Sequence, residues 1–245
     1  MTTMKTMRMG TLAALGLGAL LNACSSAKPV TKIDDGALAR LNEGQMQPVD
    51  DARIEEGRSR DQLARAHAAV QDARAKVDVA KAERDVAIAQ QNRAKAEYDM
   101  LNRQKADTAD LLRAKMDAQN AGERVKAVDM KIDYLNRSVG VVQLEEQVAQ
   151  QHAAVTAAAT ERAKFQALQA AGSNEVRGLN AGEADARLAD AQAKEAQLRK
   201  QAADRRVELV ESYNRFQELD ARLRTQPAPA PAPTAAPVMP SEPTR

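Results

Sequence analysis

The sequence predicts an all-α protein, a long antiparallel coiled-coil helical hairpin between a disordered N-terminal tether and a Pro-rich C-terminal tail. Three observations support this fold class. No proline occurs between residues 50 and 225, and apolar residues recur there every seven positions. Charged residues make up 29% of the chain, whereas aromatic residues make up 2% and tryptophan is absent. So few bulky side chains do not build a globular core, whereas this composition is typical of long helices.

Residues 1–23 have the layout of a secretory signal peptide. Lys5 and Arg8 precede an apolar run from Leu12 to Leu21, and small residues follow it. The run is too short to cross a bilayer as a helix, which needs about 20 residues. These two basic residues also account for the net charge of +2, so the rest of the chain is neutral.

At the end of the signal peptide stands Leu21-Asn22-Ala23, and the next residue, Cys24, is the only cysteine of the chain. This stretch resembles the lipobox of bacterial lipoproteins, with Leu three residues before the cysteine and a small residue directly before it. Asn22 departs from the small or hydroxyl residue that is commoner at its place. The resemblance implies cleavage between Ala23 and Cys24, with lipid on the Cys24 thiol and usually an acylated new amino terminus. The alternative is an ordinary secreted protein with a free thiol.

The resemblance also implies a location. Ser25 and Ser26 follow the cysteine, and aspartate does not. In Gram-negative lipoproteins this pattern favours sorting to the outer membrane. We therefore expect the protein to be anchored there and to face the periplasm; the alternative location is the cell surface. Two or more acyl chains give stable membrane attachment, whereas a single chain does not.

We expect residues 24–49 to form a lipidated flexible tether. The segment contains Pro29, Gly36, Gly44 and Pro48 and little heptad order. Its Cys24-Ser25-Ser26 and Lys32-Ile33-Asp34 are faintly similar to the start of Braun-type lipoproteins. The C-terminal lysine that joins that family to peptidoglycan is missing here, because the chain ends in Arg245.

Residues 50–225 are the predicted coiled-coil hairpin. Its first apolar rows are Leu63, Val70 and Val77, and Ala66, Ala73, Ala80, Ala87, Ala94 and Leu101. The next rows are Leu111, Ala118, Val125, Ile132 and Val139, and Ala114, Ala121, Val128, Leu135 and Val142. The heptad phase slips by one residue near Asn102–Asp110, where we expect a local adjustment of the supercoil. Alanine buries little area, so stability must come from many weak layers.

Acid-first pairs at i, i+4 indicate solvated helix faces. They are Glu56/Arg60, Asp72/Lys76, Asp99/Arg103, Asp133/Arg137, Asp190/Lys194, Glu195/Arg199 and Glu218/Arg222. Each such pair supports a helix by roughly 0.2–0.5 kcal/mol.

We expect the chain to reverse near Val139 and Gly140. This turn gives nearly equal arms, 50–138 and 141–225, each extending about 130 Å at 1.5 Å per residue. It also places the glycine-rich interruption at 172–182 opposite the phase slip. The competing position for the turn is 172–182 itself, where Gly172, Gly178 and Gly182 are concentrated.

Residues 226–245 form a Pro/Ala-rich tail with seven prolines. Such a composition predicts an extended polyproline segment that cannot build a core. It serves either as a spacer or docking tail in the envelope or simply as a solubilising tail.

No catalytic residues, cofactor or metal site are predicted. His67 and His152 are the only histidines, and neither has a cysteine or a second histidine at metal-ligand spacing. Nearly all carboxylates have basic neighbours along open helices, and nothing indicates the buried pair with separated pKa values that acid–base catalysis requires. With no basic patch, nucleic-acid binding is not expected either.

These features predict a non-enzymatic, membrane-anchored lipoprotein that acts as a periplasmic spacer, scaffold or partner-binding rod of the bacterial envelope. Its expected partners are the membrane, through the lipid anchor, and envelope proteins or further copies of itself, through the coiled coil. The alternative is an accessory component of an efflux or secretion conduit. The hairpin resembles those of periplasmic adaptor proteins and outer-membrane channel factors, but it lacks their β-rich parts.

Overall fold

The computed structural model describes residues 33–176 and 180–225. Their elements are α1 (Asp35–Leu38), α2 (Glu43–Arg103), α3 (Thr108–Ala170), the short 3₁₀ helix η1 (Asn174–Val176) and α4 (Ala181–Thr225). No strand occurs in these two ranges. The predicted all-α fold class is confirmed.

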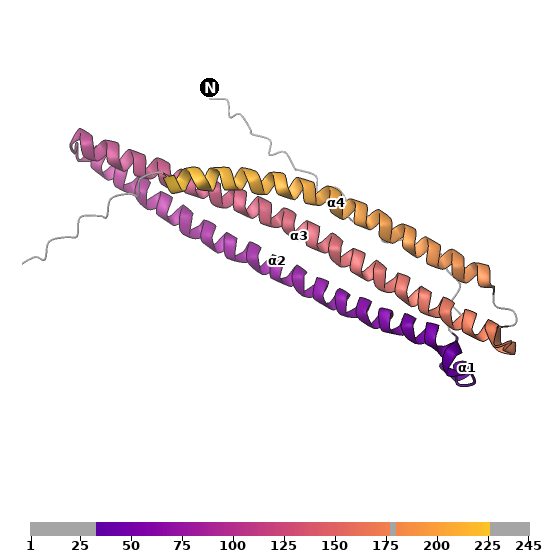
Figure 1. Cartoon of the computed structure of the whole chain (residues 1–245). Helices are drawn as coiled ribbons and strands as arrows, with labels where there is room; N and C mark the ends of the chain where they lie inside the picture. The colour runs from indigo at the N-terminus through magenta and orange to yellow at the C-terminus, as the bar shows by residue number, and fades with distance from the viewer. Residues whose placement is uncertain (1–32, 177–179, 226–245) are drawn as a thin grey trace, which may run out of the picture.

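The three long helices lie side by side in an elongated rod, with α3 in the middle (Figure 1). Side-chain contacts show that neighbouring helices run antiparallel, because partner numbers rise on one helix as they fall on the other. Between α2 and α3 the pairs include Ser59/Thr156, His67/Glu146 and Glu83/Lys131; between α3 and α4 they include Arg162/Asp185 and Glu145/Arg206. Within the described ranges, α2 and α4 form no extensive interface with each other.

Seven members of the predicted heptad rows are buried, where α2 packs against α3 instead of the predicted second arm, 141–225. Buried members of these rows are Val70, Ala73, Val77, Ala80, Ala87, Ala114 and Leu135. Because most are alanines, each layer buries little apolar area, and the 61-residue and 63-residue helices stabilise one another through their length.

The prediction of a turn at Val139–Gly140 is wrong. Helix α3 continues through both residues without interruption. The first reversal lies instead at 104–107, inside the predicted phase slip, where Lys105 has a left-handed backbone (φ 54°). A single glycine costs a helix only about 1 kcal/mol, which a helix packed on two neighbours tolerates.

The second reversal lies between Ala170 and Ala181, at the competing position identified in the sequence. Gly172 takes a left-handed φ of 66° there, a conformation that side-chain-bearing residues rarely adopt. The chain therefore forms two helical hairpins that share α3, not one hairpin with equal arms.

The predicted tether is also too long. Helix α2 begins at Glu43, seven residues before the predicted start, and contains Pro48. A capping box stabilises this start: Gln45 N donates to Asn42 Oδ1 (2.9 Å) and Asn42 N donates to Gln45 Oε1 (3.1 Å). Helix α1 also lies within the predicted tether. The remaining tether, 24–32, and the predicted tail, 226–245, lie outside the described residues.

Several predicted i, i+4 pairs form ion pairs, namely Glu56/Arg60, Asp133/Arg137, Asp190/Lys194 and Glu195/Arg199. In the Asp99/Arg103 pair, Arg103 Nε instead donates to the backbone oxygen of Asp99.

Candidate functional site

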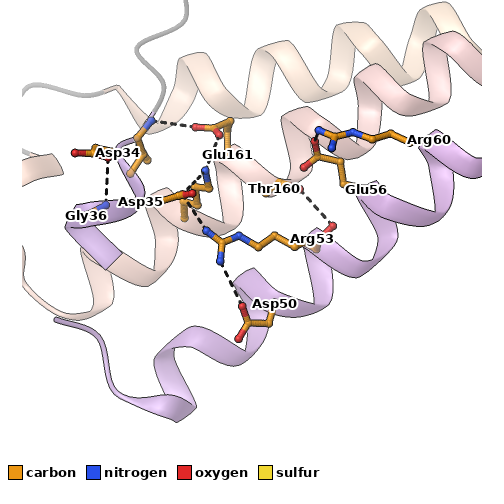
Figure 2. A network of polar contacts seen from close by, with 12 residues as sticks. Asp34, Asp35, Gly36, Asp50, Arg53, Glu56, Arg60, Thr160 and Glu161 are labelled. Carbon is orange, nitrogen blue, oxygen red and sulfur yellow. Dashed lines mark hydrogen bonds and ion pairs between the residues drawn. The ribbon is translucent and has the colours of Figure 1, made fainter. Parts of the chain in front are cut away.

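A polar cavity lies at the end of the rod where α1, the start of α2 and the end of α3 meet. It has a volume of about 740 Å³. Its lining residues are Ile33, Asp34, Asp35, Arg53, Glu56, Arg60, Ala157, Thr160, Glu161 and Lys164. Figure 2 shows charged side chains around this cavity directed toward one another from the three helices. We call this end of the rod, opposite the 104–107 turn, the base, and we call the polar contacts of Ile33, Asp35, Arg53, Glu161 and Lys164 the base network.

The base network fastens the N-terminal end of the described chain to the helices. The backbone N–H of Ile33 donates to Glu161 Oε2 (3.1 Å), across 128 residues of sequence. Asp35 Oδ1 accepts from Arg53 Nη2 of α2 (2.9 Å) and lies 3.0 Å from Lys164 Nζ of α3. One carboxylate therefore links α1, α2 and α3.

The charges in this network compensate one another. The hydrogen bond from Lys164, its positive charge and the nearby Arg53 hold the pKa of Asp35 below its ordinary value of 3.8. Burial alone would lower the pKa of Lys164, but its bonds to Asp35 and Glu161 outweigh burial and raise the pKa above the ordinary 10.5. Both groups are thus charged at neutral pH. The arrangement suits structural fastening, because an acid–base catalyst needs a group that titrates near the working pH.

An apolar cluster beside the network completes the base. Its buried members are Ala37, Leu38, Val49, Ala167 and Leu168, and Ile33, Leu41, Met46, Ala163 and Val176 pack against it. Leu168 and Val49 are among the largest fully buried side chains of the described residues. Because it joins the start of α2 and the end of α3 to α1, this cluster holds the base together in addition to the ion pairs.

The structure does not bring the sequence-predicted site residues into view. The lipobox residues Leu21, Asn22, Ala23 and Cys24, with the predicted cleavage and lipidation sites, lie outside the described residues. The sequence reasoning missed the base network because it assigned 24–49 to a flexible tether. The pair Asn42/Gln45, a capping-box signal, and the apolar Leu38, Leu41 and Val49 could have indicated structure there.

The two histidines each contact a glutamate on a neighbouring helix. His67 Nδ1 of α2 lies 2.8 Å from Glu146 Oε1 of α3, and His152 Nδ1 of α3 lies 3.1 Å from Glu195 Oε1 of α4. Over the described ranges, no three His, Cys, Asp or Glu side chains are grouped so that they could hold a metal ion.

Comparisons of the chain with protein-family models, with curated proteins and with solved structures found no match. Across residues 33–176 and 180–225, no helix combines the length and apolar character that crossing a membrane requires.

Proposed function

We propose that the protein is a non-enzymatic lipoprotein that holds a helical rod at the surface of the bacterial outer membrane, as a spacer or partner-binding scaffold facing the periplasm. One observation carries the proposal: the base network fixes Ile33 and Asp35 to the end of the rod opposite the α2–α3 turn (Figure 1). A lipid on Cys24 would thus join the chain close to this end, and the 104–107 turn would form the far end of the rod.

The dimensions follow from chain geometry. Ile33 follows the proposed lipid on Cys24 by nine positions, so the base lies at most about 30 Å from the membrane surface. Helix α3 spans 63 residues, which extend about 95 Å at 1.5 Å per residue. If the rod stands upright, its tip reaches about 125 Å from the anchor.

The tip offers side chains for a partner. Helix α4 ends short of the α2–α3 turn at 104–107, which forms the tip of the rod (Figure 1). Near the tip, therefore, only α2 and α3 pack against each other. Met100, Leu112 and Met116 flank the turn and are 47%, 59% and 49% exposed. Methionine adapts to irregular apolar partners, which suits a contact surface.

The anchor is tested by metabolic labelling with a fatty-acid analogue. The wild-type protein should carry the label and fractionate with the outer membrane, whereas Cys24→Ala should carry none and move to the soluble envelope fraction. Wild-type protein without label would exclude the lipid anchor. Cys24→Ser, which keeps the side-chain size and removes the thiol, is the matched control and should behave as Cys24→Ala does.

The scaffold role is tested by photo-crosslinking in cells, with a crosslinking amino acid placed at Met116 near the tip or at Ile54 near the base. Recovery of envelope proteins from the tip position, and not from the base position, is the expected outcome. Recovery of the components of one export pump would support the conduit alternative. Equal, non-selective crosslinking from both positions would contradict a directed rod.

A further inference from the structure

Helix α4 depends on a single neighbour. It packs along α3, whereas α2 covers another side of α3, and within the described chain α2 and α4 share no extensive interface. Losing the contacts to α3 would therefore release α4 while the α2–α3 pair remained intact.

The buried face of α4 is poor in apolar side chains. Its buried residues are Glu195, Ala202 and Ser212, whereas α2 buries Val49, Val70 and Val77 together with several alanines. Apolar burial is the main favourable contribution to helix packing, so α4 is held less firmly than α2.

The N-terminal half of α4 packs on α3 through half-buried Leu188 and Leu198 and buried Ala202, and its other contacts are polar. Arg162 Nε lies 2.6 Å from Asp185 Oδ1, and Gln151 Nε2 donates to the backbone oxygen of Ala191 (3.2 Å). Exposed or partly exposed contacts of this kind add little stability, because water replaces them readily.

Glu195 is the unusual residue of this half. It is only 7% exposed and occupies the heptad row that continues through Ala202, Leu209 and Phe216. It pairs with Arg199 of its own helix, and its contact across the interface is His152. That contact is close, but His152 Nδ1 makes no hydrogen bond of good geometry within the described residues. Removing a carboxylate from water is costly, and His152 compensates for little of that cost across the interface.

The C-terminal half of α4 is held differently. The ring of Tyr134 on α3 lies 5.1 Å from the ring of Tyr213 and 6.2 Å from that of Phe216, measured between centroids. Aromatic contacts of this kind add stability beyond the area they bury.

We propose that the N-terminal half of α4, residues 181–205, lifts from α3 as a unit while the aromatic contact to Tyr134 keeps the C-terminal half in place. Lifting uncovers an apolar row on α3, Val148 and Val155, which continues the heptad row of Tyr134 and Val141. We call residues 181–205 the strap. The buried Glu195 determines how readily the strap opens.

Hydrogen exchange of the full chain tests the strap, read peptide by peptide by mass spectrometry. Backbone amides of 185–205 should exchange at least roughly tenfold faster than those of 70–87 in α2, because local opening precedes global unfolding in weakly packed elements. Amides of 209–220 should be slower than those of 185–205. Equal protection of α2 and both halves of α4 would overturn the proposal.

Two variants test the role of Glu195 in opposite directions. The double variant His152→Leu/Glu195→Leu replaces the polar contact with apolar packing and should slow exchange of 185–205 roughly tenfold, as apolar replacement of buried pairs often does. His152→Leu alone leaves the buried carboxylate without its cross-helix neighbour and should speed it. The matched control His67→Leu/Glu146→Leu alters the α2–α3 side and should leave 185–205 unchanged. Slower opening in the control, or no change in either test variant, would overturn the assignment to Glu195.

Discussion

The ammonium group of Lys164 lies 3.0 Å from Asp35 Oδ1 and 3.1 Å from Glu161 Oε1, and its side chain is only 11% exposed. This contact joins the first described helix to a residue near the end of α3. Together with the apolar cluster around Leu38 and Leu168, it holds α1 at the end of the rod opposite the 104–107 turn. The proposed anchor on Cys24 would use both sets of contacts to direct the rod.

The attachment of residues 33–38 should depend on pH at both extremes. Folding lowers the pKa of Asp35. The stability that its carboxylate adds to the attachment is therefore complete above the ordinary pKa of 3.8 and is lost as the pH falls through the lowered pKa of the folded state. Folding raises the pKa of Lys164. The stability that its ammonium group adds to the attachment is therefore complete below the ordinary pKa of 10.5 and is lost as the pH rises through the raised pKa of the folded state.

The NMR methyl signals of Leu38 and Val49 report this attachment. We expect them to stay constant from about pH 5 to about pH 9 and to change outside that range. Lys164→Met should remove the alkaline change and leave the apolar cluster in place. A change centred near neutral pH would show that another group controls the attachment.

A second prediction concerns the buried hydroxyl pair of the α2–α3 interface. Ser59 Oγ and Thr156 Oγ1 share a hydrogen bond of 2.8 Å and are 0% and 6% exposed. Ser59→Ala removes one partner, but Thr156 can still donate to Ala153 O (3.0 Å), so the free energy of unfolding should fall by only about 1 kcal/mol.

Urea unfolding of the two single variants, Ser59→Ala and Thr156→Val, and of the double variant measures the coupling. The double variant should lose less than the sum of the singles, by about 0.5–1 kcal/mol, because both singles break one shared bond. Strict additivity would mean that the two hydroxyls do not interact in solution.

The heptad spacing predicted correctly which residues are buried, because helix packing depends on side-chain spacing. It predicted the wrong partner, since 50–138 was expected to pack against 141–225, whereas α2 packs against α3. The row through Val70 and Val77 and the row through Ala73, Ala80 and Ala87 are buried as expected. The turn at 104–107 was missed because it contains no glycine or proline and places Lys105 in a left-handed conformation. A one-residue slip of the heptad was interpreted as a change of supercoil, although a reversal produces the same slip.

The base network was missed for a different reason. Ile33 and Glu161 are separated by 128 residues, and the Asp35–Lys164 contact is similarly distant, so no local spacing links them. Such pairings become visible only when the number and position of the turns are known. Gly36, Gly44 and Pro48 also favoured a flexible segment, yet the capping box and the burial of Val49 outweigh them.

A third prediction tests the aromatic contact between α3 and α4. Tyr134→Ala removes the ring that faces Tyr213 and Phe216 and should cost about 2 kcal/mol of local stability. Near-ultraviolet circular dichroism should weaken and exchange of 209–220 should accelerate, whereas 70–87 should be unaffected. Tyr134→Phe keeps the ring and serves as the control. Unchanged exchange in Tyr134→Ala would show that α4 is held elsewhere.

The final prediction distinguishes the two turn positions by glycine replacement. Gly140 lies inside α3, and no atom lies within 4 Å of the position that a Cβ would take, so Gly140→Ala should stabilise the protein by roughly 0.5–1 kcal/mol through helix propensity alone. Gly172 has the same free space but a φ of 66°, so Gly172→Ala should destabilise by roughly 1 kcal/mol. Gly57→Ala, in the exposed interior of α2, is the control and should behave as Gly140→Ala does. The midpoints of urea unfolding measure all three. A helix interior is more stable with alanine than with glycine, whereas a turn with a positive φ favours glycine. If Gly140→Ala lost stability and Gly172→Ala gained it, the chain would reverse at Val139–Gly140.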